Sequence, residues 1–318
     1  MDVTITRPAT RRTTLAATLA STLLLIPAAG LAQAPDRVDL PNGWQPEGIT
    51  TDGTNLYVGS LADGAIWRGD PMTGQGSVLA AGVEGLSAAG VDWEEGADRL
   101  WAAGAGSAQV RAFDAASGEL LQTYPFEAGF LNDVAATPEA VFVTDSFMPQ
   151  LLVIPIGEDG SIAAPEETQS LPLSGDLVYG EGFNVNGIVA HPAGLIVVHT
   201  AEGQLYRVDP ATGEASLIDS GGAELTAGDG MELAGDTLYV VRNQLNQVAV
   251  LELDPGATTA TLVGELSADG LDVPTTAALI GDDLWAVNAR FGTDATAETE
   301  YWITRLDAAA AEEVSTEE

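Results

Sequence analysis

The chain has 318 residues, no cysteine, and 11 basic residues against 47 acidic ones, which gives a formal net charge of −36 at pH 7. Every basic residue is an arginine, so disulfides, cysteine nucleophiles, zinc–thiolate sites and lysine Schiff bases are excluded. The strong negative charge disfavours nucleic acid and anionic membrane surfaces as partners and favours cations in general.

Residues 1–34 are predicted to be an export signal. An apolar stretch over 15–31 ends at a small-residue cleavage site, Ala32-Gln33-Ala34, and three arginines precede it: Arg7, Arg11 and Arg12. The arginine pair partly resembles a twin-arginine signal, and a membrane anchor is the alternative interpretation. No later apolar run is long enough to span a bilayer. We therefore expect a secreted or periplasmic protein that is not inserted in a membrane after cleavage.

Short apolar runs separated by Gly, Asp, Asn and Pro dominate the chain after the signal and favour an all-β fold. Six of these runs recur at spacings of roughly 40 to 55 residues, and a second and a third strand follow each one. The six runs are 48–50, 90–92, 132–135, 186–189, 230–233 and 276–279. A lone four-stranded sheet cannot bury both faces, so repeats of this length stack around an axis. The sequence predicts one six-bladed β-propeller with four-stranded blades over residues 35–307.

The ends of the predicted propeller and its turns have their own signals. Three five-residue segments, each starting with Asp and ending with Gly, are interpreted as turns between third and fourth strands rather than as metal ligands: 70–74, 114–118 and 209–213. The last repeat lacks a fourth strand, and residues 36–40 lack a partner, so we expect this N-terminal strand to close the last blade. The acidic segment 308–318 is predicted to be disordered.

Oxygen-bearing side chains stand at the start of four of the six opening strands, which line the axis of a propeller. They are Glu47, Asn132, Asn186 and Asp229. Two carboxylates and two amides suit calcium, which takes six to eight oxygen ligands, and other hard divalent cations are alternatives. In a purely structural interpretation, these side chains only satisfy backbone amides at strand ends.

The segments around these four residues resemble one known family. They are Gln45–Ile49, Leu131–Asp133, Val185–Ile188 and Gly228–Met231. In this order they are similar to the regucalcin/gluconolactonase family and its strictosidine-synthase-like and paraoxonase-like relatives. The resemblance implies a six-bladed propeller with axial calcium, held by Glu47, Asn186 and Asp229, and with Asn132 facing metal or substrate. Many members hydrolyse lactones or organophosphate esters, but the histidine pair of the paraoxonase-like enzymes has no counterpart here.

The remaining candidates lie beside the predicted metal site. His199 ends a second strand on the same face, where a general base would be useful, although a packed strand-end histidine is the alternative. His191 is expected in a solvated turn on the opposite face. Asp133 should point away from the metal and support its blade. The substrate contacts are predicted to come from the loops of this face: Arg242, Asp145 and Asn288.

Two functions from different classes follow from these predictions. The first is an exported, calcium-dependent hydrolase of lactones or related esters, with Asp229 or His199 as the base and Asn132 at the reacting group. The second is a non-catalytic propeller that binds a ligand or a protein and has a structural axial calcium. Lyase or condensation chemistry would need a pocket glutamate that the sequence does not place. A small-molecule ligand and a monomer are expected.

Overall fold

The computed structural model describes Met1 and residues 34–311. The predicted export signal lies outside the described residues except for its two ends, and so do residues 312–318 of the predicted disordered tail. The first residues of that tail form a short 3-10 helix, η3 (Ala308–Ala310). Within the described part of the chain, no helix is both long and apolar enough to cross a membrane.

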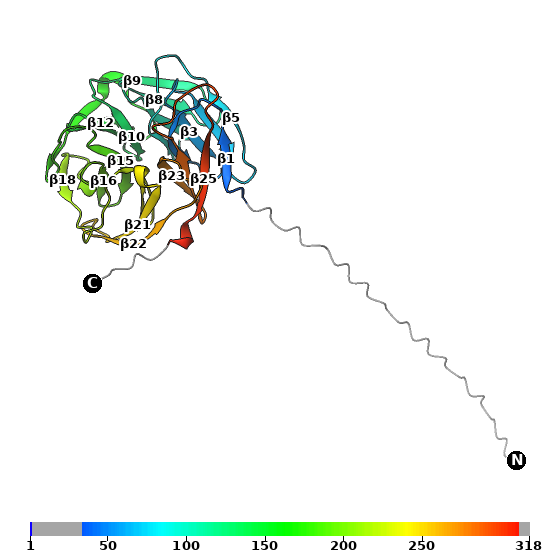
Figure 1. Cartoon of the computed structure of the whole chain (residues 1–318). Helices are drawn as coiled ribbons and strands as arrows, with labels where there is room; N and C mark the ends of the chain where they lie inside the picture. Colours follow the sequence, from blue (N-terminus) through cyan, green and yellow to red (C-terminus); the bar gives the residue numbers. More distant parts are fainter. Residues whose placement is uncertain (2–33, 312–318) are drawn as a thin grey trace. The chain divides into compact units, whose positions relative to one another are not determined.

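Six sheets form the blades of a β-propeller, which confirms the predicted fold. Figure 1 shows them arranged as a ring around a common axis. Blade 1 contains β2 (Pro46–Thr51), β3 (Leu56–Ser60), β4 (Ile66–Asp70) and β5 (Gln75–Ala80). Blade 2 contains β6 (Val91–Glu94), β7 (Arg99–Ala103), β8 (Gln109–Asp114) and β9 (Leu120–Pro125). Blade 3 contains β10 (Leu131–Ala136), β11 (Ala140–Asp145), β12 (Gln150–Pro155) and β13 (Gln169–Pro172).

The second half of the ring follows the same plan, with one addition in blade 4. Blade 4 contains β15 (Val185–His191), β16 (Gly194–His199), β17 (Gln204–Val208), β18 (Glu214–Leu217) and a short parallel strand, β14 (Ser174–Gly175). Blade 5 contains β19 (Gly228–Ala234), β20 (Thr237–Arg242), β21 (Gln247–Leu253) and β22 (Ala260–Leu266). Blade 6 contains β23 (Pro274–Ile280), β24 (Asp283–Asn288), β25 (Tyr301–Asp307) and β1 (Arg37–Leu40). Two further 3-10 helices are η1 (Pro165–Glu167) and η2 (Asn243–Leu245).

The N-terminal strand closes the ring as predicted. β1 pairs antiparallel with β25, with Arg37 opposite Thr304 and Leu40 opposite Tyr301. An ion pair reinforces the junction, because the Arg305 guanidinium lies 2.5 Å from a carboxylate oxygen of Asp36. The unpaired edge of β25 is thereby covered.

The three predicted Asp-to-Gly turns connect the third and fourth strands of blades 1, 2 and 4. In the first of them the Gly74 N–H donates to the Asp70 carbonyl at 2.9 Å, and the Asp70 carboxylate accepts the Met72 N–H at 2.8 Å. Gly74 has a φ of 68°, a backbone conformation that favours glycine. Turn chemistry therefore accounts for the Asp and Gly of these segments.

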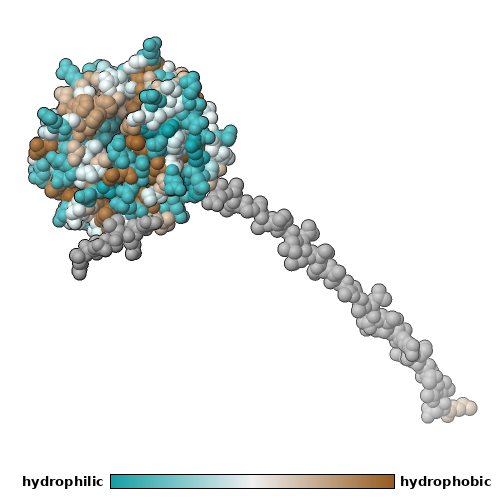
Figure 2. Space-filling view, in the orientation of Figure 1, coloured by the Kyte–Doolittle hydropathy of each residue, from teal (hydrophilic) through white to brown (hydrophobic). Residues whose placement is uncertain are grey.

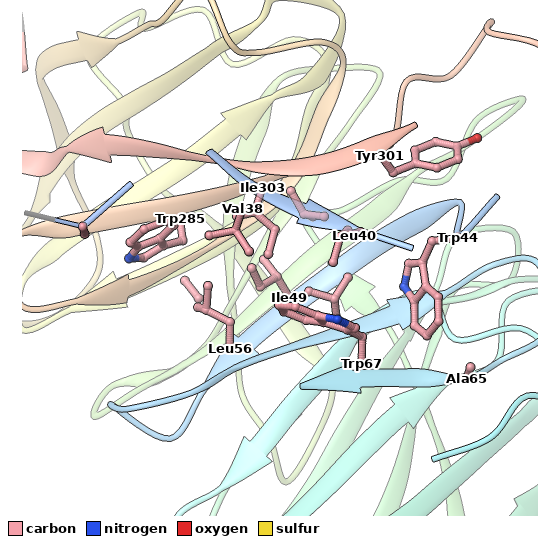
Figure 3. Packing of buried hydrophobic residues seen from close by; sticks show 14 residues of the cluster. Val38, Leu40, Trp44, Ile49, Leu56, Ala65, Trp67, Trp285, Tyr301 and Ile303 are labelled. Carbon is pink, nitrogen blue, oxygen red and sulfur yellow. The ribbon is translucent and has the colours of Figure 1, made fainter. Parts of the chain in front are cut away.

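The hydrophobic core is divided among the interfaces between blades. Each of six buried clusters combines residues of two neighbouring blades. Figure 3 shows the cluster between blades 6 and 1, where Trp285 faces Leu56 and Trp67 lies beside Ile49. Apolar residues on both sides of each central strand are needed for this arrangement, which explains the continuous apolar runs of the second strands. On the visible face, hydrophilic side chains surround separate hydrophobic patches (Figure 2).

Glycines allow the inner strands to approach one another around the axis. A Cβ on Gly48 would lie 2.4 Å from the Ala89 carbonyl oxygen, and one on Gly187 would lie 2.3 Å from the Asp229 carbonyl oxygen. Both clashes are with the backbone of the next blade, which cannot move without shifting its sheet. The glycine that follows Glu47 or Asn186 in the sequence is therefore required by packing, and a Cβ on Gly230, which follows Asp229, would lie 2.3 Å from the Thr276 hydroxyl oxygen.

The Gly187→Ala substitution is expected to lower the free energy of unfolding by about 1–3 kcal/mol, because the added methyl group forces two inner strands apart. Urea denaturation followed by circular dichroism measures this change. The matched control is Gly106→Ala, since a Cβ at Gly106 meets nothing within 4 Å. Equal unfolding midpoints for the two variants would contradict this role of Gly187.

Candidate metal site at the propeller axis

Bulges in the inner strands turn four polar side chains toward the axis. The pairing register shifts at each of them, between Pro46 and Ile49 in β2 and at the equivalent points of β10, β15 and β19. A bulge interrupts the alternation of side chains and redirects one of them. The four redirected residues line one cavity of about 200 Å³: Glu47, Asn132, Asn186 and Asp229. The structure thus brings together all four residues that the sequence proposed as ligands.

The other two blades contribute no charged group at this position. Ala89 precedes Gly90 in blade 2 as Glu47 precedes Gly48 in blade 1. In blade 6 the bulge lies between Pro274 and Ala277, and the Thr275 hydroxyl donates to the Glu47 carbonyl oxygen at 2.6 Å. The four side chains whose oxygens could bind a cation therefore come from blades 1, 3, 4 and 5.

Hydrogen bonds fix the orientation of two of the four side chains. The Asn243 amide donates to Asp229 Oδ2 at 2.7 Å. The Asn132 amide nitrogen donates to the Ser146 hydroxyl at 2.9 Å, and that hydroxyl donates to the Val185 carbonyl at 2.7 Å. Because its nitrogen is used in this way, Asn132 presents its oxygen as the atom that suits a cation.

The two carboxylates are buried close together. Burial raises the pKa of Glu47 well above its usual range, and the nearby charges of Asp229 and Asp133 raise it further. Burial also raises the pKa of Asp229 to about 7, although hydrogen bonds from Asn243 and Asn186 lower it. Neither Glu47 nor Asp229 forms an ion pair with another described residue. Two adjacent buried carboxylates without a basic partner are suited to a divalent cation.

The four side chains of the axial cavity suit a hard cation only when the two amide oxygens are counted with the two carboxylates. Nowhere in the described residues do three or more His, Cys, Asp or Glu side chains form a group that could hold a metal ion. Two carboxylates balance a charge of +2, and the oxygens of Asn132 and Asn186 would complete the set. Oxygen ligands alone favour calcium, magnesium or manganese over zinc and copper.

Apart from Asn243, which directly follows the predicted contact Arg242, the rest of the cavity wall was not predicted from the sequence. Leu61, Thr200 and Asn243 follow second strands, and Phe130, Phe183 and Phe291 are aromatic. A signal for two of them exists, because the pair Gly-Phe precedes both Asn132 and Asn186 by a few residues. The other residues lie in loops whose length differs between blades, so the repeat gives no register for them.

A second cavity of about 170 Å³ contains Asp133 and two more acidic residues, Asp92 and Glu232. Burial raises the pKa of Asp92 to about 6, of Asp133 to about 7 and of Glu232 to about 8. The Asp133 carboxylate accepts the Val134 N–H at 2.9 Å and the Ile188 N–H at 3.1 Å. It links blades 3 and 4, which confirms its predicted supporting role.

Asp145, a predicted substrate contact, does not line the axial cavity. Its buried carboxylate accepts four backbone N–H groups and the side-chain amide of Gln150. The four backbone donors are Gly129, Phe130, Phe147 and Met148, at 2.8 to 3.1 Å. The side chain therefore organises the loops of blade 3.

The Asp145→Ala substitution is expected to lower the free energy of unfolding by at least about 2 kcal/mol, because it leaves several buried N–H groups without an acceptor. Thermal unfolding and limited proteolysis of the blade 3 loops measure the loss. Asp114→Ala is the control, since the Asp114 carboxylate makes similar bonds to Ser117 in an exposed turn. Unchanged stability with weaker ligand binding would instead support the predicted substrate contact.

Asn288, a second predicted contact, also has its polar atoms occupied elsewhere. Its oxygen accepts the Asp272 N–H at 2.8 Å, and its nitrogen donates to the Thr304 hydroxyl at 2.9 Å. Arg242, the third, forms an ion pair with Glu265 at 3.0 Å and lines a separate cavity of about 480 Å³. The structure thus holds these two side chains away from the axis, because neighbouring strands supply their partners.

The two histidines are both buried. His199 Nδ1 accepts the Glu202 N–H at 3.3 Å, and Nε2 has no hydrogen-bond partner among the described residues. The axial cavity does not include it, so its role as a base stays a prediction. The expectation that His191 is solvated is wrong: its Nδ1 accepts the Ala193 N–H at 3.0 Å, and it lines a cavity of about 690 Å³.

Comparisons with known proteins give the fold. No known protein family matches the sequence, and neither does any curated protein. The major allergen Mala s 1 of Malassezia sympodialis is similar in structure, with 17% identity, a TM-score of 0.67, and 89% of this chain and 99% of that chain covered. A luciferin-regenerating enzyme has 12% identity and a TM-score of 0.57, with 87% and 95% covered. A streptogramin B lyase has 12% identity and a TM-score of 0.52, with 85% and 96% covered. At these identities the likeness establishes the propeller fold alone.

Proposed function

We propose that this chain is an exported, calcium-dependent hydrolase of lactones or related esters. One observation carries the proposal: two buried carboxylates and two amides from four blades meet in one cavity at the axis. The cavity reaches the surface at Phe183 and Phe291, so a small molecule can enter it. The enzyme names of two structural neighbours, a lyase and a luciferin-regenerating enzyme, are compatible with this proposal.

The side chains of the cavity would divide the work as follows. Glu47, Asp229 and Asn186 would hold the cation, and Asn132 would face the cation or the substrate. When bound, the cation would polarise the substrate carbonyl and stabilise the negative charge that develops on its oxygen. Asn243 keeps the Asp229 carboxylate oriented.

Proton transfer in this proposal falls to the acids of the cavity. Glu47 and Asp229 are the titratable side chains among the described residues that line it. Either carboxylate could accept a proton from an attacking water molecule that comes within hydrogen-bond reach. The apolar wall opposite lowers the local dielectric and strengthens these interactions.

A non-catalytic binding propeller is the second candidate. The proposed ligands come from blades 1, 3, 4 and 5, so a bound cation would tie these blades together even without catalysis. No histidine lines the cavity within the described residues, which also suits a binding function.

The test is elemental analysis of the purified protein, followed by a screen of lactones and aryl esters with and without a chelator. One calcium per chain with chelator-sensitive hydrolysis would support the hydrolase. Calcium without hydrolysis of any compound would favour the binding propeller. A protein that binds no divalent cation at all would refute the site.

A further inference from the structure

The mouth of the axial cavity is apolar on one side and polar on the other. Leu61 of blade 1, Phe130 of blade 3 and Phe291 of blade 6 line it, together with Phe183, which leads into blade 4. The polar side consists of Thr200 and Asn243, which follow the second strands of blades 4 and 5. We define the aromatic collar as these four apolar side chains together with Phe147, which does not line the cavity but packs against Phe130 and Phe183.

Three rings of the aromatic collar pack on one another. Phe130 and Phe183 meet edge to face with ring centroids 5.2 Å apart. Phe147, in the loop between β11 and β12, lies 4.8 Å from Phe183 and 5.8 Å from Phe130. Mutual packing holds these rings in place without a ligand, so the surface that they present is preformed.

The aromatic collar nevertheless remains open to solvent. Phe147 is 48% exposed, Phe183 is 44% exposed and Phe291 is 45% exposed. Gathered exposed aromatic side chains at the rim of a cavity mark a binding surface, whereas single exposed apolar residues need no explanation. A ligand that covers these rings would remove their apolar area from water.

The polar side has few groups left for a ligand. The Thr200 hydroxyl donates to the Gly228 carbonyl at 2.8 Å, and the Asn243 amide donates to Asp229 at 2.7 Å. A ligand rich in hydroxyl groups would have to leave several of them unpaired against the aromatic collar. Such unpaired groups cost binding energy, so the wall selects against polyhydroxylated compounds.

Resting on the proposed function, we infer that the substrate is a neutral lactone or ester with an apolar alkyl or aryl substituent. Its carbonyl group lies over Asn132, Asn186 and Asp229, and its substituent lies on the aromatic collar. The net charge of −36 disfavours anionic compounds, and the aromatic collar contains no carboxylate that would pair with a cationic substituent, which favours neutral compounds. A cavity of about 200 Å³ holds a small ring, so a longer substituent extends out to the exposed Phe147.

Hydrolysis of matched lactones tests the inference. We expect kcat/KM for δ-decalactone to exceed that for unsubstituted δ-valerolactone by about 10- to 100-fold, because several methylene groups leave water. Polyhydroxylated glucono-δ-lactone should fall below both. Phe183→Ser and Phe291→Ser should each reduce the decalactone-to-valerolactone ratio by about fivefold to tenfold. Phenyl acetate against ethyl acetate distinguishes an aryl from an alkyl preference.

The control variant is Leu120→Ser, which changes an equally exposed apolar residue (51% exposed) on the outer strand of blade 2. It should leave every ratio unchanged. A preference for glucono-δ-lactone, or ratios that Phe183→Ser does not alter, would overturn the inference while leaving the hydrolase proposal intact.

Binding of the neutral fluorophore N-phenyl-1-naphthylamine tests the aromatic collar without relying on catalysis. One molecule should bind per chain, and Phe183→Ser combined with Phe291→Ser should weaken binding at least about tenfold. This result in a protein that hydrolyses no lactone or ester would refute the proposed reaction and support an apolar ligand. Equal binding by wild type and variant would refute the inference itself.

Discussion

Replacement of Asp229 by alanine is expected to remove stoichiometric calcium from the purified protein and to lower chelator-sensitive hydrolysis at least about a hundredfold. The substitution deletes one of two carboxylates in the axial cavity, so the charge of a divalent cation is no longer balanced. Elemental analysis and lactone kinetics measure the two effects, and circular dichroism reports whether the blades remain folded.

Two further variants sharpen this test. Asp229→Asn keeps the size and hydrogen bonding of the side chain and should lose calcium almost as completely. Asn243→Ala removes only the hydrogen bond to Asp229 Oδ2 and should weaken calcium binding by about 10- to 100-fold. A protein with Asp229→Ala that still carries one calcium per chain would show that the calcium is held elsewhere.

The metal-free protein is expected to lose stability as the pH rises from about 5 to 8, by on the order of 3 kcal/mol or more. Burial raises the pKa of Asp92 to about 6, of Asp133 and Asp229 to about 7, and of Glu232 to about 8. In the unfolded chain these groups titrate near pH 4. The folded state binds their protons more tightly than the unfolded chain does. The resulting contribution to the free energy of unfolding is therefore complete below pH 4 and is lost as each group ionises in the folded protein.

Urea titrations in chelator at a series of pH values measure this profile. Glu232→Gln should flatten it and raise stability at pH 8, because the half-buried group no longer ionises. The exposed Glu119→Gln serves as the control. Added calcium should restore stability at pH 8 in wild type but not in Asp229→Ala, since a ligand that binds only the folded state stabilises it. A flat profile in wild type would contradict the ionisation argument.

The fold could be predicted because every blade repeats the same physical requirement. An apolar second strand packs on both neighbouring blades, and in blades 1, 4 and 5 a polar residue followed by Gly starts the inner strand, as in Asn186-Gly187. The repeat also placed Glu47, Asn132, Asn186 and Asp229, since the same bulge recurs in each of their strands. Their gathering in one cavity was thus predictable, whereas a bound metal and catalysis remain proposals.

The residues beyond the inner strands could not be predicted in the same way. Asp145, Asn288 and Arg242 are the last residues of second strands, but their partners come from other loops and strands. Phe183 and Phe291 lie in segments of unequal length, where no repeat sets the direction of a side chain. A position on the correct face therefore does not determine which cavity a side chain enters.

The pairing of β1 with β25 has a consequence for how the molecule is made. β1 and β25 are separated along the chain by all the other strands, so the ring closes only through the last blade, and no earlier blade can replace this pairing. During synthesis, five blades can form in order as they leave the ribosome, but the circle stays open until Tyr301–Asp307 emerges. Once β1 has paired with β25, the ring has no terminal blade with a free edge. Separation of these two strands is therefore the first step of any unfolding that begins at blade 6.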